Sequence, residues 1–358
     1  MIRGMPRRRL PKRLLMAASG AGLIGIITAT VIAATQPDGP FASGYGVCGG
    51  SGAPPAAGKH EANLYYVTGS SLLATNLSAT SVERTMVVST SVDHRRVAVL
   101  SSKPRVVIPR PASEDSDVQA IWSPSVNKAG SAIAYVTGPA KTMGLFSGEG
   151  DIAVSSPEGQ DRRMLTSHGG ATNPAWSPDG SKIAFVEEGV IHVMNPDGSQ
   201  LHSAGGPDDV NTITWSPNGA CIAASVGQSP SRIAIINVNT KNYSWLQTPI
   251  ADKYYPAWSP FGNSLVYAQG ESGRLYLTDL THNQTRLLVD CPPSSCSQDL
   301  WPAWSPDGSL IAFTRYNGHS EQIAIVATAG GPVSQVTRGP AEHSLANWGP
   351  SDASAPAP

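Results

Sequence analysis

Short apolar runs, separated by turns rich in Gly and Pro, recur along most of the chain. The clearest unit reads AWSPDGSKIAFV from Ala175: a strand ends at tryptophan, a Ser-Pro-Asp-Gly turn follows, and a buried apolar strand comes next. Proline presets φ for such a turn and glycine accepts its closing geometry. A third strand is expected over 190–195 and a fourth near 200–203. The pattern therefore predicts a repeating unit of four antiparallel strands.

This unit begins five times, near residues 121, 175, 214, 257 and 303, and a copy of its first strand ends the repeat region. Successive repeat tryptophans are 54, 39, 43, 46 and 44 residues apart. Periods of this length are typical of β-propellers, in which each blade has four strands. We expect these residues to pack between adjacent blades: Trp122, Trp176, Trp215, Trp258, Trp304 and Trp348.

Two incomplete units flank the five clear ones. Residues 91–100 form a degenerate copy without tryptophan, and strands expected over 64–67, 72–77 and 82–86 lack a first strand. The segment 345–348 is a first strand that lacks the other three, so joining it to the N-terminal strands would close a ring. The expected fold class is therefore all-β, a β-propeller with seven blades favoured and six possible, closed by a C-terminal first strand joining N-terminal strands.

The signature Trp-Ser-Pro-Asp-Gly-Ser-x-Ile-Ala-Phe resembles the repeats of the TolB-type β-propeller family, over essentially all of residues 63–349. Members of that family include a periplasmic component of an envelope-spanning complex, propeller domains attached to peptidases, and a few sugar-acid lyases. The resemblance implies a propeller scaffold and protein binding on its funnel face. The chain departs from the envelope component because it has no room for the small α/β domain that precedes that propeller.

The N-terminal region has the composition of a membrane leader. Six cations lie within residues 1–13, and an uncharged stretch of about 21 residues follows, long enough to cross a bilayer as a helix. The basic flank is expected to stay in the cytoplasm, which places the rest of the chain outside. Residues 1–35 are thus predicted as a signal anchor in the cell membrane, or as a signal peptide whose cleavage leaves a secreted or periplasmic protein.

The parts around the repeats have the composition of unstructured segments. Residues 36–62 are expected to form a flexible Gly/Pro/Ala linker, and residues 350–358 a disordered tail. The repeat region itself, over 63–349, is the predicted propeller.

Charge excludes one class of partner. The formal net charge is −1, but six of the 25 basic residues lie in the leader, whereas all 26 acidic residues lie after it. The body is therefore acidic, which argues against nucleic acid as a partner.

Acidic residues recur where each fourth strand would connect to the next first strand, on the funnel side of a propeller. We interpret them as a ring that attracts a protein or peptide with a cationic patch; the alternative is that they are ordinary solvated turn residues. Three aromatic residues, Tyr254, Tyr255 and Trp301, precede repeat tryptophans and are candidates to line the same funnel. The acidic residues are Glu114, Asp115, Asp117, Asp208, Asp209, Asp252, Asp299 and Glu342.

The four cysteines have different expected roles. Cys291 and Cys296 bracket a four-residue loop, which outside the cytoplasm predicts a local disulfide. Cys221 begins a buried strand and is expected to be an inert core thiol. For Cys48, in the linker, a reactive thiol and an intermolecular bridge both stay open.

Catalytic motifs are missing from the sequence. It contains no Gly-x-Ser-x-Gly elbow, no His-Glu-x-x-His and no phosphate-binding loop, so we assign no catalytic residue, metal ligand or cofactor. The primary hypothesis is an extracytoplasmic, membrane-tethered propeller that acts as a protein-binding or scaffold module of the cell envelope. The alternatives are a metal-dependent polysaccharide (sugar-acid) lyase and a sensor of a small ligand.

Overall fold

The computed structural model describes residues 48, 61–68, 71–78, 97–100, 104–107, 119–139, 150–156, 161–270, 272–292, 296–337 and 343–350. The chain divides into two compact units, residues 1–37 and 38–358, and every described residue belongs to the second. The predicted leader, 1–35, lies outside the described residues, as does the predicted tail except Pro350, which ends a strand. Within the described part, no helix combines the length and the apolar character needed to cross a bilayer.

Five antiparallel sheets have four strands each and are numbered here as blades in chain order. The first blade has β5 (Gln119–Val126), β6 (Ile133–Pro139), β7 (Asp151–Ser155) and β8 (Arg163–Met164). The second has β9 (Ala171–Trp176), β10 (Ile183–Glu187), β11 (Val190–Met194) and β12 (His202–Ser203). The third has β13 (Val210–Trp215), β14 (Cys221–Val226), β15 (Arg232–Asn237) and β16 (Tyr243–Trp245).

The fourth blade has β17 (Lys253–Trp258), β18 (Ser264–Gln269), β19 (Leu275–Asp279) and β20 (Gln284–Val289). The fifth has β21 (Gln298–Trp304), β22 (Leu310–Tyr316), β23 (Glu321–Ala327) and β24 (Ser334–Gln335). Two smaller sheets remain: β2 (Ser71–Ser78), β1 (Glu61–Thr68) and β25 (His343–Pro350) in one, β3 (Val97–Leu100) and β4 (Pro104–Val107) in the other.

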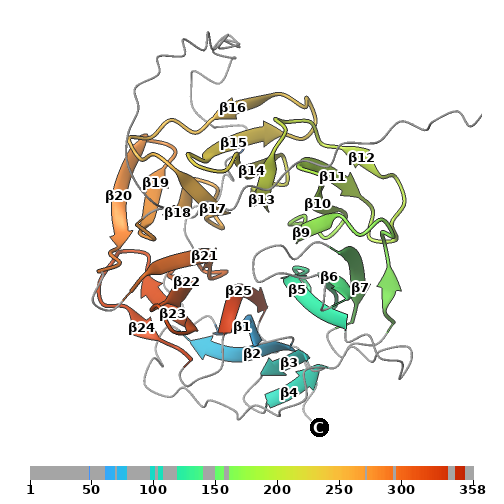
Figure 1. Ribbon diagram of the computed structural model, residues 1–358, viewed down its shortest axis with the longest axis horizontal. Coiled ribbons are helices and arrows are strands. Elements are labelled where there is room, and N and C mark those ends of the chain that lie inside the picture. The colour runs from blue at the N-terminus through green and yellow to red at the C-terminus, as the bar shows by residue number, and fades with distance from the viewer. Residues whose placement is uncertain are drawn as a thin grey trace, which may run out of the picture. The chain divides into compact units, whose positions relative to one another are not determined.

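The molecule is an all-β propeller, but the expectation of seven blades, or alternatively six, is wrong. Among the described residues only five sheets have the four strands of a blade. In the segment around residues 89–110, counted as a blade from its sequence, the described residues form the hairpin β3–β4. The first strands of the blades lie side by side around a common centre, with β25 between β21 and β5 (Figure 1).

The C-terminal strand pairs with the N-terminal strands, as the ring closure requires. Strand β25 pairs with β1 in antiparallel register, which sets Trp348 opposite Leu64. Strand β1 in turn pairs with β2 along its full length. The three-stranded sheet therefore joins the two ends of the repeat region, so that β1 has partners on both sides.

The turn that follows each first strand is the same in all five blades. The residue that opens it donates its N–H to the carbonyl five residues later and accepts the N–H of the turn glycine, at 2.8–3.0 Å. A side-chain oxygen of the same residue also accepts a backbone N–H of the strand that follows. The opening residues are Asn127, Ser177, Ser216, Ser259 and Ser305.

The first blade corrects the assignment of Trp122 as a repeat tryptophan. Val126 occupies the place that Trp176 has in the second blade, because each pairs with the first residue of the following strand. Trp122 lies four residues earlier, and the Ser123-Pro124 that follows it forms a bulge within β5 instead of a turn. The sequence Trp-Ser-Pro therefore lies at the turn after the first strand in the second blade, but inside the first strand in the first blade.

The core consists of apolar clusters that span neighbouring blades. Second strands such as β14 are buried at all six positions because they have a strand on each side and a blade over each face. One cluster joins the second and third blades through Val193, Trp215 and Ile236, and others join the third to the fourth and the fourth to the fifth. The indole N–H of Trp215 donates to the carbonyl of Ala175 in the preceding blade at 3.0 Å.

Candidate functional site

A backbone bulge interrupts the first strand of four blades at the same position. In each, the residue before a proline has left-handed φ, and the strand pairing shifts at this point. The four residues and their φ values are Ser123 (45°), Asn173 (51°), Tyr255 (53°) and Trp301 (49°). A bulge re-aims a side chain relative to the regular alternation of a strand, and left-handed φ is uncommon outside glycine.

These four residues all line one pocket of about 290 Å³ between the first strands of the five blades. The third blade has no proline at this position and contributes Thr212, Ile213 and Thr214 from β13. The pocket walls also include Pro124, Pro174, Pro256 and Pro302, together with Ala257, Trp258, Ala303 and Trp304.

One wall of the pocket is aromatic. The rings of Tyr255 and Trp301 have centroids 5.3 Å apart at an interplanar angle of 55°. Burial raises the pKa of Tyr255 above its usual value of 10, so its hydroxyl is neutral at physiological pH. Of the three aromatic residues predicted for the funnel, these two line the pocket.

Tyr254, the third predicted aromatic residue, points elsewhere. It does not line the pocket, and its hydroxyl donates to the carbonyl of Gln228 at 2.6 Å. Burial first, and then Asp252, raise the pKa of Tyr254 to about 12. Its ring still adjoins that of Tyr255, with centroids 6.0 Å apart at an interplanar angle of 40°, but only Tyr255 lines the pocket.

The opposite wall is made of hydroxyl and amide side chains that the sequence analysis missed. Asn173 Nδ2 donates to the carbonyl of Asn211 at 2.7 Å, which leaves Asn173 Oδ1 toward other partners. Within the described chain, the hydroxyls of Ser123 and Thr214 make no hydrogen bond to protein, and no charged side chain lines the pocket. All four bulge residues directly precede a proline within a first strand, and this was the available sequence signal.

The predicted acidic residues have different environments. Asp208 and Asp209 are exposed where the chain enters β13. Asp252 is half-buried and accepts a hydrogen bond from the Ser231 N–H at 2.7 Å. Asp299 is fully buried. The other four, Glu114, Asp115, Asp117 and Glu342, lie outside the described residues.

Asp299 forms a buried ion pair with Arg315. The guanidinium bonds both carboxylate oxygens, Nε to Oδ1 at 2.8 Å and Nη2 to Oδ2 at 2.7 Å, a bidentate geometry that strengthens the pair. Burial nevertheless raises the pKa of Asp299 above its usual range, while Arg315 acts in the opposite direction. The Asp299 carboxylate is therefore buried and paired with Arg315, and it is not available to bind a ligand.

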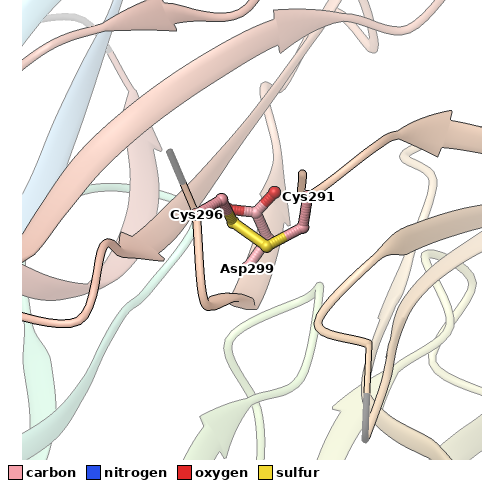
Figure 2. A group of neighbouring side chains, drawn as sticks. All are labelled: Cys291, Cys296 and Asp299. Carbon is pink, nitrogen blue, oxygen red and sulfur yellow. A yellow bond between two sulfur atoms is a disulfide. The ribbon is translucent and has the colours of Figure 1, made fainter. Parts of the chain in front are cut away.

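Next to this pair lies the disulfide Cys291–Cys296 (Figure 2). The two sulfurs and the carboxylate of Asp299 lie within 4.8 Å of one another, as the ligands of a metal would. Metal binding needs thiolates, and here the two sulfurs are bonded to each other. The disulfide is thus a structural cross-link in the connection between β20 and β21.

The second disulfide corrects the expectation for Cys221, which is not a free core thiol. It is bonded to Cys48, 173 positions earlier in the chain. Cys48 is 1% exposed and packs in the cluster of Leu246, Trp258 and Leu265 between the third and fourth blades. The predicted linker is therefore attached covalently to the propeller at this residue.

Replacing Arg315 by methionine should destabilise the fold by about 3 kcal/mol, because it leaves a buried carboxylate without its partner. The raised pKa of Asp299 sets the sign of the pH dependence. The folded state favours the protonated carboxyl. The stability that this preference contributes is therefore fully present below the ordinary pKa of about 3.9 and is lost as pH rises through the folded-state pKa. The variant should therefore lose most stability toward neutral pH, measured by urea unfolding between pH 4 and 8.

The double variant Arg315→Met/Asp299→Asn is the control for this prediction, since it removes the charge together with its partner. It should recover much of the loss and be nearly independent of pH. An equal destabilisation of the single variant at pH 4 and pH 8 would contradict the role given to the carboxylate.

Comparison with known proteins agrees with the fold. Residues 190–355 match the family described as TolB beta propeller domain. The chain is similar in structure to TolB from Acinetobacter baumannii, with a TM-score of 0.59 and 16% identity over 81% of this chain and 67% of that chain. It is also similar to putative TolB from Agrobacterium tumefaciens, with a TM-score of 0.54 and 13% identity over 78% and 90%.

A chain in the crystal structure of a nidogen/laminin complex has the same fold, with a TM-score of 0.58 and 11% identity over 80% of this chain and 98% of that chain. At such low sequence identity, structural similarity indicates a shared fold and not a shared function. The structural likeness shows the β-propeller fold, and residues 190–355 in addition match the TolB propeller family.

Proposed function

We propose that this protein is a non-catalytic, protein-binding propeller that acts outside the cytoplasm and is held at the membrane by residues 1–35. The observation that carries the proposal is a TolB-type propeller whose four cysteines are all paired in disulfides. Disulfides of this kind are typical of oxidising compartments. The basic leader followed by an uncharged stretch supports the same location.

The partner is expected to present a cationic patch. Asp208 and Asp209 are exposed at the entrance to β13, on the face where each blade connects to the next first strand. The backbone carbonyl of Asp209 accepts the Gly227 N–H at 2.9 Å, which fixes this corner of the loop. Like charges at one opening reinforce their potential and accelerate the approach of a cationic surface.

A membrane-impermeant cross-linker applied to intact cells tests both location and binding. The full chain should be cross-linked to a partner protein that mass spectrometry then identifies. If the propeller faces the cytoplasm, it stays unmodified while lysed cells give the cross-link, and the proposal is wrong.

With the captured partner, the double variant Asp208→Lys/Asp209→Lys should associate about tenfold more slowly at low ionic strength, and the difference should shrink as salt increases. Asp197→Lys is the matched control, because Asp197 is exposed in the turn between β11 and β12 on the opposite face. Stopped-flow or surface plasmon resonance measures the rates. Equal association rates of the double variant and the parent at low salt would exclude this face as the recognition surface.

A further inference from the structure

We infer that the pocket between the first strands binds one neutral sugar ring, a role beyond the proposed protein binding, through a lining that contains none of the described acidic residues. The inference rests on the polar wall, the aromatic wall and the size of the pocket.

The polar wall suits a ligand whose groups both donate and accept hydrogen bonds. Ser123, Thr214 and Asn173 Oδ1 have hydrogen-bonding capacity that no described residue uses. Hydroxyl side chains can act in either direction, as can sugar hydroxyls. A peptide backbone in an extended conformation offers less of this match, because its groups are fixed donors or fixed acceptors. The lack of charged residues among the described lining favours a neutral ligand.

The aromatic wall supplies the apolar complement. A pyranose ring has an apolar C–H face and a rim of hydroxyls, and Tyr255 and Trp301 offer adjoining ring faces at one side of the pocket. Tyrosine and tryptophan combine an apolar body with a polar tip, and neither the Tyr255 hydroxyl nor the Trp301 indole N–H has a hydrogen-bond partner within the described chain. Both kinds of contact are therefore available to one ligand.

The backbone holds these side chains in place before any ligand binds. Left-handed φ at Ser123, Asn173, Tyr255 and Trp301 costs free energy, and such positions persist where the surrounding structure fixes them. The proline after each of these residues restricts the strand further. Because these side chains are already ordered, binding a ligand costs little conformational entropy, and affinity is higher for the same contacts.

The size of the pocket limits the ligand to a single ring. A volume of about 290 Å³, enclosed by strands from five blades, is at the lower end of small-molecule sites. An extended peptide would pair its main chain with an open sheet edge. The first strands are edge strands of their blades, but in four of them a left-handed residue followed by proline interrupts the regular backbone that such pairing needs. The terminal ring of an oligosaccharide is the ligand class that fits.

Isothermal titration of the full chain tests the inference with three neutral probes, maltotriose, cellotriose and N,N′,N″-triacetylchitotriose. At least one should bind saturably with a stoichiometry of one. Trp301→Ala should weaken that binding by about tenfold or more, because the aromatic wall is lost. Trp245→Ala is the matched control: this tryptophan lies on the outer strand β16 under Arg232, and the variant should bind as the parent does.

If Trp301→Ala does not fold, Ser123→Ala and Thr214→Val test the polar wall instead, and each should weaken binding by several fold. Trigalacturonate and a proline-rich decapeptide complete the set of probes. Binding of either of these alone, or of none of the neutral sugars, overturns the inference. Sugar binding and capture of a partner protein are independent measurements, so failure of one leaves the other interpretable.

Discussion

Replacing Cys48 by alanine is expected to lower the free energy of unfolding by about 5 kcal/mol. The disulfide to Cys221 closes a loop of more than 170 residues, and the loop-entropy relation assigns about this much to a loop of that length. Burial of Cys48 between the third and fourth blades adds packing that the free segment would lose. Urea unfolding of the oxidised full chain measures the change through the transition midpoint.

Cys296→Ala is the control for this prediction. Its disulfide spans only five positions, for which the same relation gives about 2 kcal/mol. The order of the two variants is thus set by loop length. If Cys48→Ala unfolds at the same urea concentration as the parent, the bond to Cys221 does not stabilise the fold by restricting the unfolded chain.

Trp215→Ala is expected to destabilise the propeller by about 3–5 kcal/mol, because it leaves a cavity between the second and third blades. Trp215 is 8% exposed and packs against residues of both blades. The variant also leaves the Ala175 carbonyl without the indole N–H that it accepts. Urea unfolding again gives the magnitude, with the outer-strand variant Trp245→Ala expected to cost much less.

Two phenylalanine variants separate packing from hydrogen bonding. The indole N–H of Trp258 is buried and has no protein partner in the described structure, whereas that of Trp215 donates at 3.0 Å. Trp215→Phe should therefore cost about 1 kcal/mol more than Trp258→Phe. Equal costs would show that this hydrogen bond contributes nothing to the attachment of neighbouring blades.

The repeat was predictable from sequence because its signal is local. Proline and glycine at fixed places in each turn, next to a short apolar strand, determine one hairpin without reference to distant residues. The number of blades was not predictable in this way. The segment around residues 89–110 has the apolar pattern of a blade but supplies two strands, and whether further strands assemble depends on neighbours elsewhere in the chain.

Trp122 shows how a local motif misleads. The first blade keeps the turn with Asn127 in place of serine and without proline, so its true turn is hidden, and the nearby Trp-Ser-Pro takes its place in the alignment. The side-chain oxygen of Asn127 accepts the N–H five residues later, as the serine hydroxyl does in the other blades. It also accepts the N–H four residues later, which an aspartate of the turn accepts in the second and fifth blades. An alignment of residue types does not reveal that asparagine can replace serine in this hydrogen-bonding role.

The candidate site was predictable only in part, because it is assembled from several blades. The sequence places Tyr255 and Trp301 before repeat tryptophans, but it assigns Ser123 to a Trp-Ser-Pro turn and gives no sign that Thr214 faces a pocket. These residues line one pocket because the first strands converge at the centre of the ring. The bond between Cys48 and Cys221 was beyond sequence reasoning for the same reason. Contacts between distant residues depend on the closed ring.

The pairing of β25 with β1 also sets the order in which the protein can be completed. Strand β1 is among the first parts of the propeller to leave the ribosome, and the strand that covers its free edge is among the last. Until residues 343–350 arrive, that edge is an open template for any other extended chain. A chaperone that shields β1 during synthesis, or transport that delays folding until the chain is whole, would solve a problem that the finished ring no longer shows.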